Sequence, residues 1–215
     1  MGKIGIFGSS FDPITDAHLF MAKTLADLCG FRFVEFVPCC QYRGDGKVTK
    51  TSDEHRWNMI QLAIRNNPLF RADDYEMKER AGIGKQYTYF TMEYFKQKYP
   101  DDEVYFIMGA DLLANIDNPE TPIHRRWKYR EELIRENKFV IMSHGGIDMP
   151  KVISKSLLLR KYHDGTRFHL VDKGIAMEVS SKYIRDEIGM GRYPRYLMRD
   201  EVYDYIMKHG VYSKE

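Results

Sequence analysis

Runs of β-branched and aromatic residues alternate with segments of helical periodicity along this chain of 215 residues. A short apolar run bounded by turn residues is typical of a buried strand, and apolar residues three or four apart are typical of a helix that faces a core. We expect strands at 4–8, 31–38, 69–79, 103–109, 138–144 and 167–172, and helices at 16–30, 52–67 with Thr51 as the N-cap of a capping box, 87–100, 127–137, 151–165 and 196–210.

This alternation implies an α/β fold: a doubly wound, mostly parallel sheet covered by helices on both faces. Ligands of such sheets bind outside the carboxyl ends of the strands, where the strand order reverses. The loops after Phe7 and after Met108 follow two strong strands, so we expect the chemistry there. No repeat or linker interrupts the chain. We therefore predict one domain over residues 1–215, helical from about 175 to 215.

Composition excludes several classes of function. The formal net charge is only +2, so no basic field indicates nucleic acid, and no stretch approaches the 18 consecutive apolar residues of a membrane span. The cysteines, Cys29, Cys39 and Cys40, form no disulfide framework, which favours a reducing compartment and a cytoplasmic protein. No known ligand spacing predicts a metal site built from side chains.

The first loop belongs to the string GIFGSSFDPITDAHL, residues 5–19. Residues 8–10 are small, so backbone can approach a ligand closely, and the following helix directs the positive end of its dipole at the same space. Thr15 and His18 are three residues apart at the start of the helix, a spacing that brings both side chains to one face. The alternative is a plain strand–turn–helix, in which Ser9 or Asp16 serves only as a cap.

This loop resembles the [HT]-x-x-H signature of the nucleotidyltransferase superfamily, and four further stretches resemble bacterial nicotinate-nucleotide adenylyltransferases. The resemblance covers nearly the whole chain. The four stretches are KQYTYFTMEYFKQKYPDDEVYFIMGADLL at 85–113, RRWKYREELIRENKFVIMSHGG at 125–146, VSSKYIRDEIGMG at 179–191 and YLMRDEVYDYIMKHGVY at 196–212.

The resemblance implies a Rossmann-like fold and transfer of AMP from ATP to nicotinate mononucleotide, which gives nicotinate adenine dinucleotide and pyrophosphate in NAD biosynthesis. It also implies Mg²⁺ bound mainly through the ATP phosphates. The implied site residues are His18, Thr15 and Arg185 for catalysis; Gly8, Ser9, Ser10, Phe11, His18, Gly109, Asp111, Ser180, Ser181 and Arg185 for ATP; and Ser10, Thr88 and Trp127 for the nicotinate nucleotide.

Several of these residues also have plainer interpretations. Asp111 could be a helix N-cap, Trp127 a core residue, and Ser180, Ser181 and Arg185 caps and a solvated helix face. The family pattern favours a ribose acceptor at Asp111, a wall for the pyridine ring at Trp127, and a second phosphate clamp at the helix that opens with the two serines.

The chain departs from the resembled family at three places. Thr15 stands where that family usually has His, Lys182 stands where it usually has Thr, and the loop CCQYRGDGKVTK at 39–50 replaces a Lys-Pro-Pro-His-Lys-like stretch. Arg43, Lys47 and Lys50 could supply the lost positive charge.

Thr15 is typical of phosphopantetheine adenylyltransferase, which remains an alternative beside an enzyme for the nicotinamide nucleotide and a catalytically silent nucleotide-binding regulator. The residues leave open whether the chain is a monomer or a homo-oligomer.

Overall fold

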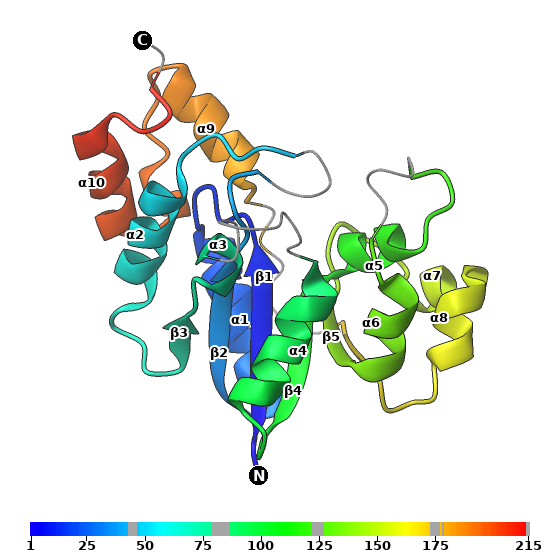
Figure 1. Cartoon of the computed structure of the whole chain (residues 1–215). Coiled ribbons are helices and arrows are strands. Elements are labelled where there is room, and N and C mark those ends of the chain that lie inside the picture. The colour runs from blue at the N-terminus through cyan, green and yellow to red at the C-terminus, as the bar shows by residue number, and fades with distance from the viewer. Residues whose placement is uncertain (43–46, 79–86, 122–126, 173–176, 178, 214–215) are drawn as a thin grey trace.

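The computed structural model describes residues 1–213 apart from 43–46, 79–86, 122–126, 173–176 and 178. Its centre is a six-stranded sheet in which all paired strands are parallel (Figure 1). The strand order is β3-β2-β1-β4-β5-β6, so the predicted doubly wound sheet is confirmed. The strands are β1 (Lys3–Ser9), β2 (Phe31–Pro38), β3 (Phe70–Ala72), β4 (Glu103–Gly109), β5 (Lys138–Met142) and β6 (Phe168–Val171).

Helices connect the strands, and further helices come after the last strand in the chain. Among the described residues, none of them is long and apolar enough to cross a bilayer. The helices are α1 (Asp16–Cys29), α2 (Asp53–Ile64), α3 (Tyr75–Lys78), α4 (Thr88–Lys98), α5 (Ala110–Ile116), α6 (Arg130–Glu136), α7 (Met149–Lys155), α8 (Leu157–Tyr162), α9 (Ser181–Gly189), the 3-10 helix η3 (Arg195–Leu197) and α10 (Asp200–His209).

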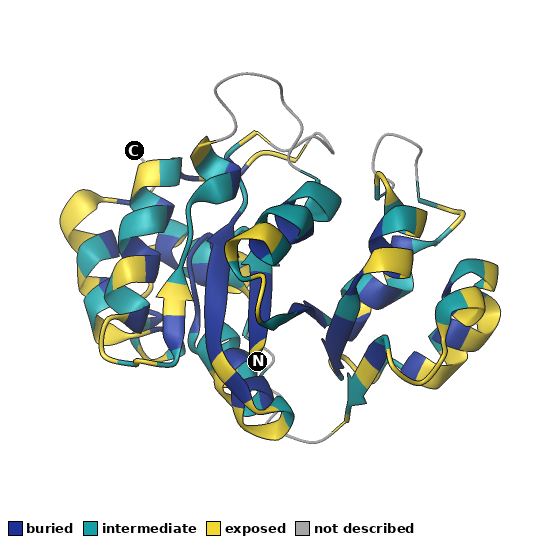
Figure 2. Ribbon diagram, turned by 60° about the horizontal axis from the view of Figure 1, so that its bottom comes forward, coloured by how far each residue is buried: buried dark blue, intermediate teal, exposed yellow. Residues whose placement is uncertain are grey.

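The core has two halves, one on each face of the sheet. Successive residues of a strand point to opposite faces. In β4, Tyr105 and Ile107 pack with α1, α2, α9 and α10, whereas Phe106 and Met108 pack with α4 to α8. Burying both faces explains why the strands are apolar runs without polar alternation. Figure 2 shows the buried strands between helices whose outer surfaces are exposed.

The structure differs from the sequence expectations at several elements, and the strand expected at 69–79 is only the short β3, followed by the helix α3. The N-cap of α1 is Thr15, not Asp16, and the N-cap of α2 is Ser52, not Thr51. The helix expected at 151–165 is two helices, because Ser156 leaves the helical conformation and its hydroxyl caps α8. Sequence periodicity does not show which of several adjacent polar residues has the extended backbone that a cap requires.

The strand order reverses between β1 and β4. These two strands are neighbours, with Phe7 paired to Ile107, but β1 continues outward to β2 and β4 to β5. Their carboxyl ends therefore place the loop after β1 beside Gly109. The predicted position of the chemistry coincides with this switch point.

Candidate active site

Thr15 and His18 form a reciprocal cap at the start of α1. The Thr15 hydroxyl accepts from the His18 backbone N–H at 3.4 Å, and the Thr15 backbone N–H donates to His18 Nδ1 at 3.1 Å. The Thr15 hydroxyl also lies 2.8 Å from the same ring nitrogen. Because Nδ1 accepts from a backbone N–H, it carries no proton. The neutral imidazole therefore has its proton on Nε2.

The surroundings of His18 favour the neutral ring. Its centroid lies 5.1 Å from that of Phe11 and 6.0 Å from that of Phe7. Burial among such groups disfavours charge and lowers the pKa of His18 to about 4. At neutral pH the ring is an uncharged hydrogen-bond donor through Nε2, at the N-terminal end of a helix. An uncharged donor next to a helix N-terminus suits a phosphate oxygen.

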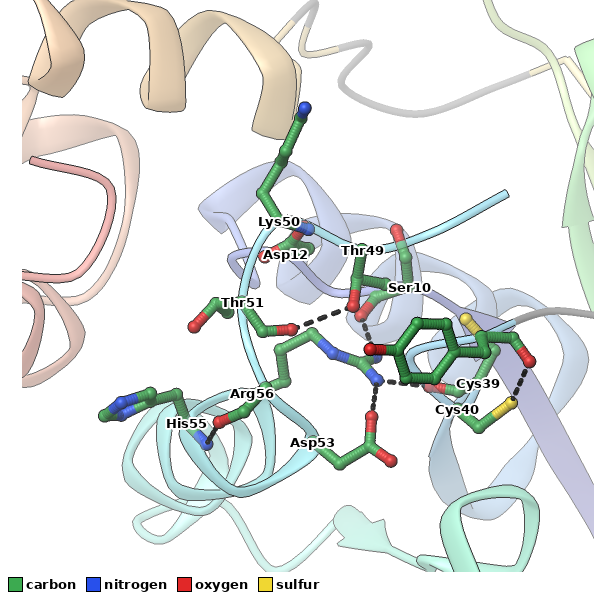
Figure 3. A network of polar contacts seen from close by, with 12 residues as sticks. Ser10, Asp12, Cys39, Cys40, Thr49, Lys50, Thr51, Asp53, His55 and Arg56 are labelled. Carbon is green, nitrogen blue, oxygen red and sulfur yellow. Dashed lines mark hydrogen bonds and ion pairs between the residues drawn. The ribbon is translucent and has the colours of Figure 1, made fainter. Parts of the chain in front are cut away.

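Arg56 holds the loop from the side of α2, as Figure 3 shows. This side chain is fully buried, and it donates to the carbonyl of Ser10 at 2.6 Å and to that of Cys39 at 2.5 Å. The charge is balanced by Asp53, whose carboxylate accepts from the guanidinium at 2.6 Å. A planar guanidinium can serve several acceptors at once, so one residue joins the ends of β1 and β2 to α2. Nothing in the neighbouring sequence marks Arg56 as buried, so the sequence alone does not single it out.

Helix α9 holds the same loop from the other side. The Ser181 hydroxyl donates to the carbonyl of Pro13 at 2.7 Å, and Arg185 donates to the carbonyl of Asp12 at 2.5 Å. Ser180 is the N-cap of the helix, and its hydroxyl accepts from the backbone N–H of Tyr183. The two predicted phosphate-binding segments, residues 8–18 and 180–185, are therefore in direct contact.

Asp12 is a second residue that sequence analysis missed. It is only 3% exposed, and its carboxylate accepts from the backbone N–H of Lys50 and from the hydroxyl of Tyr212, each at 2.7 Å. The guanidinium of Arg185 lies 3.9 Å from the same carboxylate. Three segments far apart in the sequence thus meet at one buried acid. The sequence shows the acid in FDP but none of its partners.

At the end of β4, Gly109 is the N-cap of α5 and Asp111 lies in the first turn. Asp111 is therefore not the N-cap that the alternative interpretation required. A β-carbon on Gly109 would lie 2.5 Å from Oδ1 of Asp111, so the absence of a side chain leaves room for this carboxylate. Asp111 is exposed at the carboxyl edge of the sheet, a position open to a ribose hydroxyl.

Thr88 begins α4, and Trp127 lies three residues before the start of α6. Trp127 is partly buried with its ring 6.4 Å from that of Phe106. The ring of Tyr129, at the N-cap of α6, lies within 5.8 Å of the ring of Tyr87 at the N-cap of α4. This contact joins the two segments that the resemblance assigns to the nicotinate end.

Other predicted site residues differ in how far a ligand can reach them. Phe11 is fully buried and Thr15 is 1% exposed, so at Phe11 only the backbone is available, and the Thr15 hydroxyl faces His18. The departure at Lys182 is an exposed side chain paired with Asp186. In the loop at 39–50, Lys47 and Lys50 are exposed, whereas Arg43 lies outside the described residues.

The family model described as Cytidylyltransferase-like matches residues 6–187. A probable nicotinate-nucleotide adenylyltransferase of Clostridium botulinum (strain Kyoto / Type A2) is 32% identical over 210 residues, which cover 97% of this chain and 98% of that protein. The chain belongs to the nicotinate-nucleotide adenylyltransferase family. Another member, of Clostridium tetani, is 31% identical over 213 residues, covering 99% of this chain and all of that one.

Solved structures of this family agree with the fold. Plasmodium falciparum nicotinic acid mononucleotide adenylyltransferase complexed with NaAD superposes with a TM-score of 0.76 at 25% identity, over 99% of this chain and 98% of that one. A putative nicotinate-nucleotide adenylyltransferase of Vibrio parahaemolyticus, 18% identical, has the same fold with a TM-score of 0.62. The family predicted from the sequence is confirmed, although Thr15 alone favours a sister family.

Proposed function

We propose that this protein transfers the adenylyl group of ATP to nicotinate mononucleotide and releases pyrophosphate. The observation that carries the proposal is the neutral His18, whose Nδ1 is occupied by the backbone of Thr15 and whose Nε2–H is left to donate at the switch point. The relatives named for this activity match nearly the whole chain, and their names indicate the substrate that we propose.

The reaction is a direct in-line displacement. An oxygen of the 5′-phosphate of nicotinate mononucleotide forms a bond to the α-phosphorus of ATP, and the bond from that phosphorus to the bridging oxygen breaks as pyrophosphate leaves. The attacking phosphate is ionised at neutral pH, so no general base is required. The protein contributes by holding the two phosphates in line and stabilising the charge that develops on them.

His18 Nε2–H donates to the α-phosphate, supported by backbone N–H groups of residues 8–10 and by the Ser10 hydroxyl. Thr15 acts by orienting His18. Arg185 on α9 binds the β- and γ-phosphates, since it makes one hydrogen bond to the carbonyl of Asp12 and a guanidinium has five donors. Ser181 contributes its backbone N–H in the first turn of α9, because its hydroxyl already donates to the carbonyl of Pro13. The remaining assignments are Asp111 to the ATP ribose and Thr88 and Trp127 to the nicotinate end.

Mg²⁺ is part of the proposal, because polyphosphate transfer commonly uses it to neutralise developing charge. The described residues contain no group of three or more acidic, His or Cys side chains placed to hold a metal. The nearest acid in the loop, Asp12, already accepts two hydrogen bonds. The residues of the loop thus offer donors rather than oxygen ligands, and Mg²⁺ would be held through the phosphates of ATP.

The test is pyrophosphate release by the purified protein with ATP and Mg²⁺. Nicotinate mononucleotide, nicotinamide mononucleotide and phosphopantetheine are supplied in turn, and His18→Ala serves as the control for contaminating activity. We expect release with nicotinate mononucleotide well above that with the other two acceptors. Release mainly with another acceptor would reassign the substrate, and no release with any acceptor would favour a nucleotide-binding regulator.

The cellular location is also a proposal. We infer a cytoplasmic protein, because Cys29, Cys39 and Cys40 form no disulfide with one another, a pattern typical of a reducing compartment.

A further inference from the structure

We propose that Tyr212, near the C-terminus, is a positioning residue for ATP: its hydroxyl occupies the Asp12 carboxylate and so leaves the Arg185 guanidinium available to the phosphates. The inference rests on the proposed function in one respect, namely that Arg185 binds phosphate. It adds a residue 200 positions away from the first loop to the machinery of the site.

Few hydrogen-bond donors reach the Asp12 carboxylate. It is almost completely buried, and each carboxylate oxygen accepts one close hydrogen bond: Oδ1 from the Tyr212 hydroxyl and Oδ2 from the Lys50 backbone N–H, both at 2.7 Å. A buried carboxylate that loses a donor is destabilised by the full cost of its desolvation, so it attracts any donor within reach. Figure 3 shows the Lys50 side chain extending away from Asp12, so Lys50 contributes only its backbone.

Arg185 is the donor within reach. Its Nη1 donates to the backbone carbonyl of Asp12 and stands 3.9 Å from Oδ2 of the same residue, beyond hydrogen-bond distance. The side chain is 22% exposed, so it is neither buried in the ion pair nor extended into solvent. The guanidinium is therefore held beside the carboxylate without being bound to it. Both carboxylate oxygens already have a close donor, one of them the Tyr212 hydroxyl, so the carboxylate does not draw the guanidinium closer.

Tyr212 is built to reach Asp12. The chain turns at Gly210, which ends α10 with φ 62°, and Tyr212 itself has φ 69°, a left-handed conformation that an aromatic residue rarely adopts. Val211, between them, is buried in the core. Burial and the neighbouring Asp12 raise the pKa of Tyr212, so the phenol keeps its proton and remains a donor. Backbone strain of this kind persists where the surrounding contacts compensate it.

The Tyr212 hydroxyl prevents the Asp12 carboxylate from competing with the phosphates of ATP for Arg185. Without it, Oδ1 of Asp12 has no close donor, so the carboxylate attracts the Arg185 guanidinium more strongly, and a shift of about one ångström brings Nη1 within hydrogen-bond distance of Oδ2. A guanidinium paired with a buried carboxylate is less available to the phosphates of ATP. Loss of the Tyr212 hydroxyl should therefore weaken ATP binding even though Tyr212 itself touches no substrate.

The test measures binding of ATP with Mg²⁺ by calorimetry, which does not require turnover or a correct choice of acceptor. We expect Tyr212→Phe to raise the Kd for ATP on the order of tenfold. The matched control is Tyr205→Phe, which also removes a tyrosine hydroxyl from the C-terminal segment, in this case one that bonds His55 and Asn58 on α2. That variant should lose comparable thermal stability with no change in the Kd for ATP.

A second pair of variants separates positioning from a structural role. Asp12→Asn removes the charge that attracts Arg185, so adding Tyr212→Phe to it should leave the Kd for ATP unchanged. If Tyr212→Phe alone does not fold, Asp12→Asn alone carries the test: with no charge to compete for Arg185, its Kd for ATP should not rise, and a tenfold rise would overturn the inference. An unchanged Kd in Tyr212→Phe, an equal loss in Tyr205→Phe, or a tenfold loss that persists beside Asp12→Asn would each overturn the inference. Failure of the proposed acceptor would appear only in the pyrophosphate assay.

Discussion

The backbone N–H of Thr15 donates to Nδ1 of His18 at 3.1 Å, so the residue that caps α1 also decides which nitrogen of the imidazole carries the proton. The Thr15 hydroxyl is buried against His18. The relationship assigns the two residues different tasks. His18 presents a donor, and Thr15 fixes its orientation.

Removal of the imidazole should abolish most of the turnover. We expect His18→Ala to lower kcat on the order of 10²- to 10³-fold, because it removes one donor aimed at developing charge. His209→Ala, which removes an imidazole from the exposed end of α10, is the control and should retain its rate. Steady-state pyrophosphate release measures both. A folded His18→Ala protein with a nearly normal rate would show that His18 has no role at the α-phosphate.

Loss of the Thr15 hydroxyl should affect both stability and rate. Thr15→Val keeps the shape but removes the N-cap acceptor, so we expect the free energy of unfolding to fall by about 1 kcal/mol. The rate should fall less than in His18→Ala, because the backbone N–H of Thr15 still holds Nδ1. Thr15→Ser restores the hydroxyl and should recover both quantities. Urea unfolding and kcat are the measurements; identical values for the Val and Ser variants would contradict the cap.

The lowered pKa of His18 predicts how stability depends on pH. The folded protein holds this group neutral to about pH 4, whereas the unfolded chain protonates it near 6.5. Between these values the unfolded state binds more protons, so stability rises with pH across this window and is lost as pH falls through it. The contribution is at most about 3 kcal/mol.

The comparison is with His18→Gln, which does not titrate. Its free energy of unfolding should vary less between pH 4 and 6.5 than that of the original protein. Parallel curves for the two proteins would mean that His18 titrates alike in the folded and unfolded states.

Arg56 should be among the residues whose loss most destabilises the fold. Arg56→Met removes the hydrogen bonds that Arg56 donates to Asp53 and to the carbonyls of Ser10 and Cys39, and we expect the free energy of unfolding to fall by about 3 kcal/mol. The control is Arg65→Met at the C-cap of the same helix, whose exposed ion pair with Glu201 should contribute less than about 1 kcal/mol. Thermal unfolding measures both. Equal melting temperatures in the two variants would contradict a structural role for Arg56.

Arg185 and Lys182 lie one turn of α9 apart, and their removal should have very different effects on the KM for ATP. Arg185→Ala should raise the KM for ATP about tenfold, by loss of a charge-assisted contact to phosphate. Lys182→Ala should change it little, because the exposed lysine is paired with Asp186 rather than held against the loop. The KM for nicotinate mononucleotide serves as the internal reference. A larger effect of Lys182→Ala than of Arg185→Ala would reverse the two assignments.

Several features of the protein follow from the sequence alone. Apolar runs with strand propensity predicted most of the strands within a few residues. Their alternation with helices predicts parallel pairing, because each helix returns the chain to the end of the sheet at which the previous strand began. The spacing of Thr15 and His18 placed both at one helix start, because three residues make nearly one turn. These relationships are local, so the order of residues determines them.

Only the tertiary structure shows what holds the site together. Asp12 meets Lys50, Arg185 and Tyr212, and Arg56 meets Ser10 and Cys39, across separations of 17 to 200 residues. In the sequence, Arg56 looks like any solvated arginine on a helix. The packing of α2 against the ends of β1 and β2 excludes water from it. Burial makes such polar groups depend on particular partners, and the topology of the sheet, rather than their neighbours in the chain, decides who those partners are.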